Sequence, residues 1–292
     1  MSTLHATTPT RFVEAGGIRF GFRRFGNEEG IPLVFLQHFT GTMDNWDPIL
    51  TNRLAETRPV VLFDNAGIGR STGTTPTTVA AMARDATGFI RTLGAPMVDL
   101  FGFSVGGFVA QEIAVQASDL VRCMVLAGTG PQGGEGMAQF SPKVFEILAR
   151  EGATVEERLL ELFFSPTEAS QAAGRAWLGR IATRQADREP PSPENVAAAQ
   201  LQAIQAWGKG QGDRRVYLQR IKQPVLVMNG KDDIMVPTIN SFILQQELPN
   251  AQLILYPDSG HAAVFQYPDV VGDETNHFLA PSVALAEPPA IR

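Results

Sequence analysis

The residue best suited to covalent chemistry is Ser104, which stands in a Gly-Phe-Ser-Val-Gly pattern at positions 102–106. The apolar segment Met97 to Phe103 precedes it, and Val105 to Gln116 has the pattern of a helix. A serine on a sharp strand-to-helix turn holds its hydroxyl above the sheet, and the flanking glycines avoid collisions there. The helix N-terminus would also face a developing oxyanion. We therefore interpret Ser104 as a nucleophile, with a plain turn serine as the alternative.

A serine hydroxyl needs a general base, and the chain offers four histidines. His5 lies in an N-terminal segment that we expect to be mobile, and His277 falls in a terminal helix, where a surface or packing role is expected. His261 follows the last predicted strand, at the sheet edge where Ser104 also lies. We interpret His261 as the base, with a structural loop histidine as the alternative. His38 follows a much earlier strand.

The base in turn needs a carboxylate that fixes its tautomer and stabilises the imidazolium. The strand Pro224 to Met228 runs into a polar loop that contains Asp232 and Asp233. The spacing from Gly230 favours Asp233, with Asp232 as the alternative, and a solvated turn would explain both without catalysis. The order serine, aspartate, histidine is the one expected when the nucleophile stands on a strand-to-helix turn.

Bringing these side chains together requires a sheet whose strands end at one edge. Short unbroken apolar runs predict such strands, buried on both faces, with helical patterns between them. The predicted strands are residues 11–15, 18–25, 32–36, 59–63, 97–103, 121–127, 224–228 and 251–256, and the first two form a hairpin through two glycines. The predicted helices are residues 45–56, 77–93, 105–116 and 238–247. This alternation predicts a doubly wound α/β sheet with its active edge at the strand carboxyl ends.

One segment, residues 132–223, contains no convincing strand. Amphipathic patterns predict helices there at residues 142–150, 155–164, 168–185 and 194–207. We expect this insertion to form a helical cap over the strand ends. Trp177 and Trp207 are candidates for lining a substrate channel, with packing inside the cap as the alternative. The predicted organisation is a core of residues 10–131 and 224–280, a cap of residues 132–223 and a C-terminal tail of residues 281–292.

Composition limits the remaining classes of function. The chain has 292 residues, 44% of them hydrophobic and 18% charged, with a net charge of −6, as expected of a globular protein with a sizeable core. The acidic balance argues against nucleic acid or an anionic membrane as partner, and the single cysteine, Cys123, fits a buried strand thiol. Without a signal-peptide pattern or an apolar stretch of roughly 20 residues, we expect a cytoplasmic protein. No metal-ligand cluster or nucleotide-binding turn is apparent, so we expect no metal and no cofactor.

These motifs resemble those of the α/β-hydrolase fold superfamily over about residues 10–280. The turn at Ser104 and the segments of Asp233 and His261 carry part of the resemblance. Residues 32–41 resemble the segment that supplies the oxyanion hole, and residues 64–71 resemble the family's Asp-x-x-Gly-x-Gly-x-Ser turn. The resemblance implies a mostly parallel eight-stranded sheet, flanked by helices and carrying a helical cap.

The resemblance also implies that the backbone N–H groups of Val105 and Phe39 stabilise the oxyanion. Phe39 is reached by aligning the family's His-Gly-x with Gln37-His38-Phe39, which also brings Trp46 to the usual aromatic position. This chain departs from the pattern because Gln37 and His38 replace the common histidine and glycine. An imidazole at position 38 either bonds to a neighbouring loop and fixes its shape, or lines the pocket as a substrate-binding group and narrows it.

A serine nucleophile excludes the branches of the superfamily that use an aspartate, the haloalkane dehalogenases and epoxide hydrolases. What remains is acyl transfer to water on a small ester-like molecule. Carboxylesterase ranks first because the turn at Ser104 resembles that of small arylesterases and cofactor-free haloperoxidases. Lactonases, C–C bond hydrolases and perhydrolases are alternatives, as are non-hydrolytic lyases and ligand-binding members.

Overall fold

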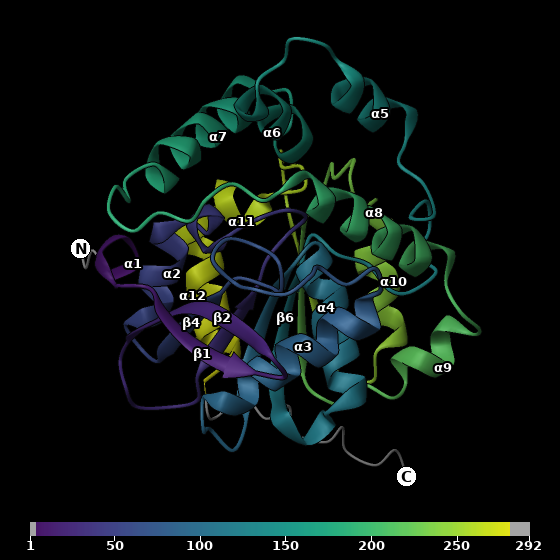
Figure 1. The fold of residues 1–292 in the computed structure, drawn as a ribbon. Coiled ribbons are helices and arrows are strands. Elements are labelled where there is room, and N and C mark those ends of the chain that lie inside the picture. The colour runs from purple at the N-terminus through teal and green to yellow at the C-terminus, as the bar shows by residue number, and fades with distance from the viewer. Residues whose placement is uncertain (1–3, 281–292) are drawn as a thin grey trace.

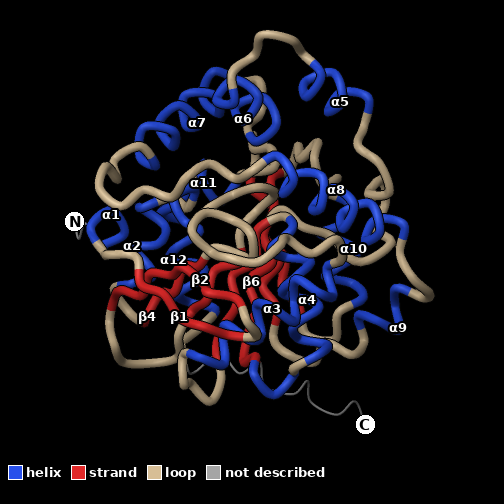
Figure 2. Tube along the Cα trace, in the orientation of Figure 1, coloured by secondary structure: helices blue, strands red, loops and turns tan. Residues whose placement is uncertain are grey.

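The structure, a computed structural model, describes residues 4–280, and the predicted tail lies outside this range. Its centre is an eight-stranded sheet in the order β1-β2-β4-β3-β5-β6-β7-β8 (Figures 1 and 2). β2 pairs antiparallel with β1 and β4, whereas the other neighbours are parallel. The predicted mostly parallel eight-stranded sheet is therefore confirmed. The strands are β1 (Arg11–Ala15), β2 (Ile18–Gly26), β3 (Leu33–Leu36), β4 (Pro59–Phe63), β5 (Val98–Phe103), β6 (Val121–Ala127), β7 (Val225–Gly230) and β8 (Ala251–Tyr256).

Helices cover both faces of the sheet, and its central strands β3, β4 and β5 are fully buried. Along β3, Val34 and Leu36 join one hydrophobic cluster while Leu33 and Phe35 join another, because successive strand side chains point to opposite faces. The first face is covered by α3 (Val79–Thr92), α4 (Val105–Gln116) and α10 (Ile239–Glu247). The second face is covered by α2 (Pro48–Ala55) and α12 (Pro268–Phe278). Cys123 on β6 is buried, as predicted.

Between β6 and β7 the described chain is helical, with α5 (Pro142–Ala149), α6 (Val155–Phe163), α7 (Glu168–Ile181), α8 (Glu194–Lys209) and α9 (Arg214–Leu218). α5, α6 and α7 lie together at the top of Figure 1, with α8 closer to the sheet. α9 lies apart from them, beside α10. α7 contacts α11 (Ala263–Gln266), which follows β8, so the insertion is seated on the segment that carries His261. None of the helices within residues 4–280 has the length and hydropathy needed to cross a bilayer.

The N-terminal segment corrects one expectation. His5, in α1 (Leu4–Thr7), is buried rather than mobile, and its Nδ1 lies 2.8 Å from the Thr51 hydroxyl. Its ring packs edge-on against Phe25. Burial, assisted by the positive charge of Arg23, lowers the pKa of His5 to about 3. The segment is too short to carry a hydrophobic period, so no pattern marks it as ordered.

Candidate active site

Ser104 stands at the junction of β5 and α4 with φ 56° and ψ −119°, a strained conformation for a residue with a side chain. The neighbouring glycines make the turn possible. A Cβ on Gly106 would collide with the Leu36 carbonyl oxygen, and one on Gly102 would lie 2.6 Å from the Gly106 oxygen. The Thr129 hydroxyl donates to the Ser104 carbonyl at 2.8 Å and helps to hold the turn. The serine hydroxyl is thus presented at the carboxyl end of a central strand.

His261 and Asp233 meet beside this turn. The His261 Nδ1 donates to Asp233 Oδ2 at 2.8 Å, and both side chains are buried. Because a carboxylate only accepts, Nδ1 carries the hydrogen and Nε2 is left as the basic nitrogen. Asp233 Oδ1 accepts the N–H groups of Met235 and Val236 at 2.8 and 3.0 Å, which fixes the carboxylate. The neighbouring Asp232 is exposed, so Asp233 is the aspartate that contacts the histidine.

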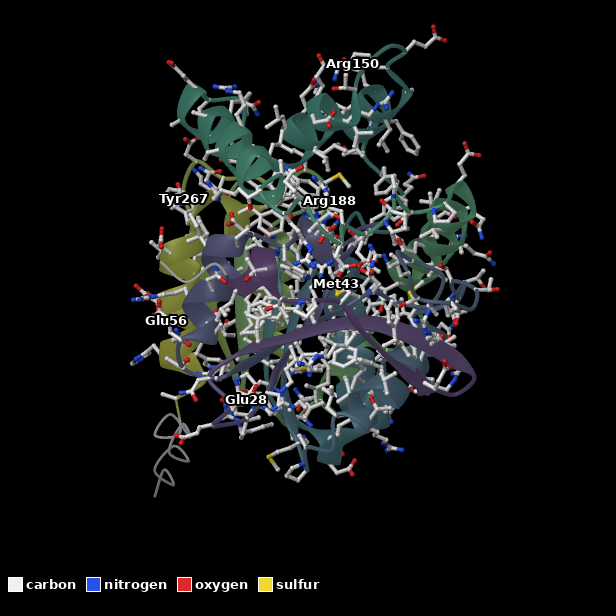
Figure 3. All side chains as sticks on the ribbon, turned by 60° about the vertical axis from the view of Figure 1, so that its left-hand side comes forward. Glu28, Met43, Glu56, Arg150, Arg188 and Tyr267 are labelled. Atoms are coloured by element: carbon white, nitrogen blue, oxygen red, sulfur yellow. The ribbon has the colours of Figure 1, made fainter. Side chains whose placement is uncertain are left out.

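Ser104 and His261 line the same cavity, which has a volume of about 570 Å³. Its walls come from the loop of residues 38–45, from α6 and α8, and from residues 188–194, which include Arg188 between the upper helices and the sheet in Figure 3. Ser104 is itself buried. A substrate therefore reaches the hydroxyl through this cavity, whose wall is mostly apolar with a few charged side chains.

Phe39 and Val105 are expected to stabilise the oxyanion, and the backbone next to each of them is held in place by its neighbours. Val105 opens α4, and the N–H groups of a first helical turn have no partner inside the helix. On one side of Phe39 the His38 N–H donates to Gln37 Oε1 at 2.8 Å, and on the other the Thr40 N–H is also bound. In the part of the chain that the structure describes, the Phe39 N–H has no hydrogen-bond partner. Phe39 also lines the cavity.

Gln200, on α8, is a residue that the sequence analysis missed. Its Oε1 accepts the Thr40 N–H at 2.6 Å, and its side chain is buried. The Ser192 hydroxyl donates to the Thr40 carbonyl at 2.7 Å. The loop that carries Phe39 is therefore held by two residues of the helical insertion. No local pattern marks such a role, because it depends on where α8 lies on the core.

His38 both bonds to its own loop and lines the cavity, so each of the two interpretations of this residue applies in part. Its Nδ1 lies 2.9 Å from the Phe39 carbonyl, which only accepts, so Nδ1 carries the hydrogen and Nε2 is bare. Nε2 is buried without a partner among residues 4–280, and the ring packs edge-on against Phe103 and Phe163. Burial, with a smaller contribution from His261, lowers the pKa of His38 to about 4, although the Phe39 carbonyl opposes the change. His38 is thus a neutral group that both bonds to its own loop and lines the cavity.

The two tryptophans of the helical insertion pack inside the protein. Trp177 is fully buried and stacks on Phe265 with ring centroids 4.8 Å apart. Trp207 stacks on Phe108 at 5.3 Å. Neither is among the side chains that line the cavity. Their positions fit the alternative interpretation, in which they pack inside the insertion and do not contact substrate. Phe163 of α6 lines the cavity instead and contacts the His261 ring.

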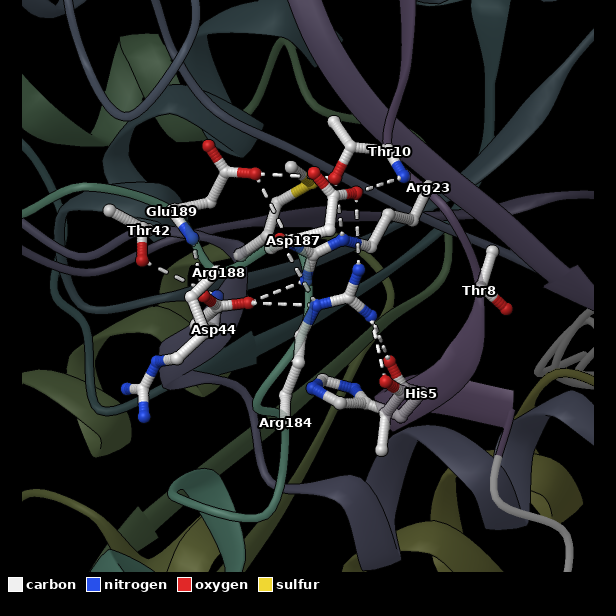
Figure 4. Close-up of polar contacts among 12 residues, drawn as sticks. His5, Thr8, Thr10, Arg23, Thr42, Asp44, Arg184, Asp187, Arg188 and Glu189 are labelled. Carbon is white, nitrogen blue, oxygen red and sulfur yellow. Dashed lines mark hydrogen bonds and ion pairs between the residues drawn. The ribbon is translucent and has the colours of Figure 1, made fainter.

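A buried group of charges fastens residues 182–193, the strap between α7 and α8, to the core (Figure 4). Arg23 is fully buried and pairs with Asp44 at 2.6 Å and with Glu189 at 3.1 Å. Arg184 donates to two carbonyl oxygens of α1 at 3.1 Å. Because Glu189 and its neighbours line the cavity, this ionic cluster fixes one of the cavity walls.

Comparisons with known proteins agree with this geometry. The family model described as "alpha/beta hydrolase fold" matches residues 31–268. The chain is 34% identical over 175 residues to the pimeloyl-[acyl-carrier protein] methyl ester esterase of Nitrosomonas europaea, a match that covers 58% of this chain and 66% of that protein.

Solved structures give the same result. An alpha/beta hydrolase fold protein from Chitinophaga pinensis is 41% identical, with a TM-score of 0.89 over 95% of this chain and 99% of that one. Est816, described as an N-acyl homoserine lactone degrading enzyme, has a TM-score of 0.73 and 23% identity, covering 92% of this chain and all of its own. The second likeness shows the fold alone.

Proposed function

The chain belongs to the α/β-hydrolase fold family, and we propose that it is a serine hydrolase that cleaves a carboxylic ester-type bond in a small molecule through an acyl-enzyme. In this proposal residues 132–223 act as the cap over the site. The esterase relative supports the choice of an ester bond. The cytoplasmic location and the independence from metals and cofactors stay predictions.

The proposed reaction assigns one task to each side chain. Ser104 Oγ attacks the ester carbonyl while His261 Nε2 takes its proton, and Asp233 stabilises the imidazolium that forms. The N–H groups of Val105 and Phe39 stabilise the oxyanion of the tetrahedral intermediate. The intermediate collapses and releases the alcohol, which takes the proton from His261. Water then attacks the acyl-enzyme by the same steps and releases the acid.

The observation that carries the proposal is the combination of one shared cavity and one oriented base. Ser104 and His261 both line the cavity, and the 2.8 Å bond to Asp233 leaves the basic nitrogen of His261 free. A plain turn serine would not require the strained backbone of Ser104, which is maintained at a structural cost.

The test is hydrolysis of short p-nitrophenyl esters by the variants Ser104→Ala and His261→Ala. Each should lower kcat by about a thousandfold or more, because the members of a triad act as a unit. Ser118→Ala, an exposed serine outside the cavity, serves as the matched control and should behave as wild type. A folded Ser104→Ala protein that keeps more than about a tenth of its activity would refute the mechanism.

A further inference from the structure

A second cavity, of about 310 Å³, lies between α5 and α8, and we call it the groove. Phe145, Leu148 and Ala149 of α5 form one wall, and Leu201, Ile204 and Gln205 of α8 form the other. The loop of residues 137–140 closes one side. None of the residues that line the groove carries a charge. Its chemistry therefore suits an uncharged, apolar ligand.

The groove shares its walls with the active-site cavity. Phe140, Leu148 and Leu201 line both. On α8, Ala197 faces the active-site cavity, Leu201 faces both and Ile204 faces the groove. Residues spaced by three or four positions lie on one face of a helix, so a single face of α8 runs along both cavities. The two cavities therefore meet at Leu201.

Three large apolar side chains that line these cavities are exposed to solvent. Phe145 is 53% exposed, Leu148 is 40% exposed and Val155 is 66% exposed, and each lines one or both cavities. Apolar side chains gathered around a concave site commonly mark a ligand-binding groove. An extended apolar ligand running from the active-site cavity into the groove would remove part of this surface from water.

We propose that the groove is a subsite for an uncharged aliphatic or aromatic arm of the substrate. The arm extends from the ester carbon at Ser104 past Leu201 and lies between α5 and α8. The inference rests on the proposed function, since it places the scissile bond at Ser104. The arm belongs either to the acyl group or to the alcohol. Each methylene that it buries should raise kcat/KM by roughly fourfold until the groove is filled.

Two series of esters of increasing chain length test this proposal. One series is p-nitrophenyl esters from acetate to dodecanoate, which lengthens the acyl group, and the other is alkyl acetates from methyl to decyl, which lengthens the alcohol. Phe145→Asp introduces a charge into the groove at a half-exposed position, where a charged side chain can still reach water. Its matched control is Phe242→Asp on α10, at a residue that is 51% exposed and lines neither cavity.

In wild type, kcat/KM should keep rising with chain length in one of the two series. Phe145→Asp should lower kcat/KM by about tenfold for the long members of that series and by less than about twofold for acetate or methyl acetate. Phe242→Asp should leave both profiles unchanged. Ile204→Trp, at a residue that lines the groove and not the active-site cavity, fills the groove without adding charge and should likewise penalise only the long members.

Two results would overturn the subsite. One is a flat wild-type profile in both series, and the other is an equal loss at all chain lengths in Phe145→Asp. Either result, combined with short-ester hydrolysis that still requires Ser104, would refute the groove and leave the proposed function in place. Hydrolysis that survives Ser104→Ala would refute the proposed function itself. If Ile204→Trp fails to fold, the comparison of Phe145→Asp with Phe242→Asp decides the question.

Discussion

Asp233 accepts a hydrogen bond from His261 on one oxygen and two backbone N–H groups on the other. Asp233→Asn retains the size of the side chain, but an amide hydrogen directed at His261 would favour the wrong imidazole tautomer. We expect kcat for a short ester to fall by about a thousandfold or more, whereas Asp232→Asn should change kcat by less than about twofold. Steady-state assays of both variants test this ranking, and the opposite order would move the role to Asp232.

His38 provides the second residue-scale prediction. His38→Gly removes a ring that lines the cavity, so bulky esters should gain relative to acetate by about tenfold. Because burial lowers the pKa of His38 to about 4, the imidazole stays neutral above that value. The pH–rate profiles of wild type and variant should therefore coincide from neutral pH upward and differ only near pH 4. An unchanged ester ranking and identical profiles would leave His38 as a loop scaffold alone.

The sequence predicts that Ser104, Asp233 and His261 lie close together, and the structure brings Asp233 to His261 and places Ser104 in the same cavity as His261. Ser104, Asp233 and His261 are marked by their type, their order and their positions after strands. The placement of Trp177 could not be predicted, because an aromatic residue on an amphipathic helix packs inward or lines a cavity with the same periodicity. The burial of His5 depends on Thr51 and Phe25, which are distant in sequence.

At the scale of elements, α8 and the loop that carries Phe39 are coupled through Gln200. Gln200→Leu removes the acceptor of the Thr40 N–H and should let the loop move. We expect kcat for a short ester to fall by about tenfold with a smaller change in KM, because the oxyanion donor loses its fixed position. Gln202→Leu, at an exposed position on the same helix, is the matched control. Equal kcat in both variants would show that the loop holds its shape without Gln200.

Element boundaries were predictable where the sequence contains its own start and stop signals. β1, β4, β6 and β8 have the predicted limits because turn residues or helices flank each apolar run. α7 ends at Ile181, whereas the predicted helix continued to residue 185. Residues 182–185 instead begin the strap, which is held by contacts to distant parts of the chain. The short helices α9 and α11 carry too few residues to show a helical period.

At the scale of the whole molecule, buried charges join the strap of residues 182–193 to the sheet and to the loop after β3. Asp64 Oδ1 accepts the Met43 N–H at 2.7 Å. Burial raises the pKa of Asp64, and the negative charge of the nearby Glu189 raises it further. A raised carboxyl pKa means that the folded state binds the proton more tightly than the unfolded state. The stability that this proton contributes is present at low pH and is lost as the pH rises through the raised pKa.

We therefore expect Asp64→Asn, which imitates the protonated acid, to weaken the loss of stability as the pH rises above the ordinary carboxyl range. Urea midpoints measured across this rise in pH should converge with wild type, or exceed it, at the alkaline end. Asp232→Asn, at an exposed carboxylate, is the control and should follow wild type. Parallel curves for Asp64→Asn and wild type would show that protonation of Asp64 does not contribute to the stability of the folded state.

The sheet and the helical insertion could be predicted at this scale, whereas the contacts between them could not. Strand and helix periodicities are local, and they indicate an insertion between β6 and β7. The pairing of Arg23 with Glu189 and the meeting of the two cavities at Leu201 join positions far apart in the chain. Both contacts depend on how distant segments pack, and the local patterns of a single sequence do not describe that packing.

The central claim is that Ser104 becomes acylated during turnover. The most direct measurement is rapid acid quenching of the enzyme with p-nitrophenyl acetate, followed by intact-protein mass spectrometry and peptide mapping. The mechanism predicts one added acetyl group, located on Ser104, that appears within the first turnover, disappears when substrate is exhausted and is absent from Ser104→Ala. Ester hydrolysis at the wild-type rate with no acetyl group on Ser104, or with the acetyl group on another residue, would contradict the claim.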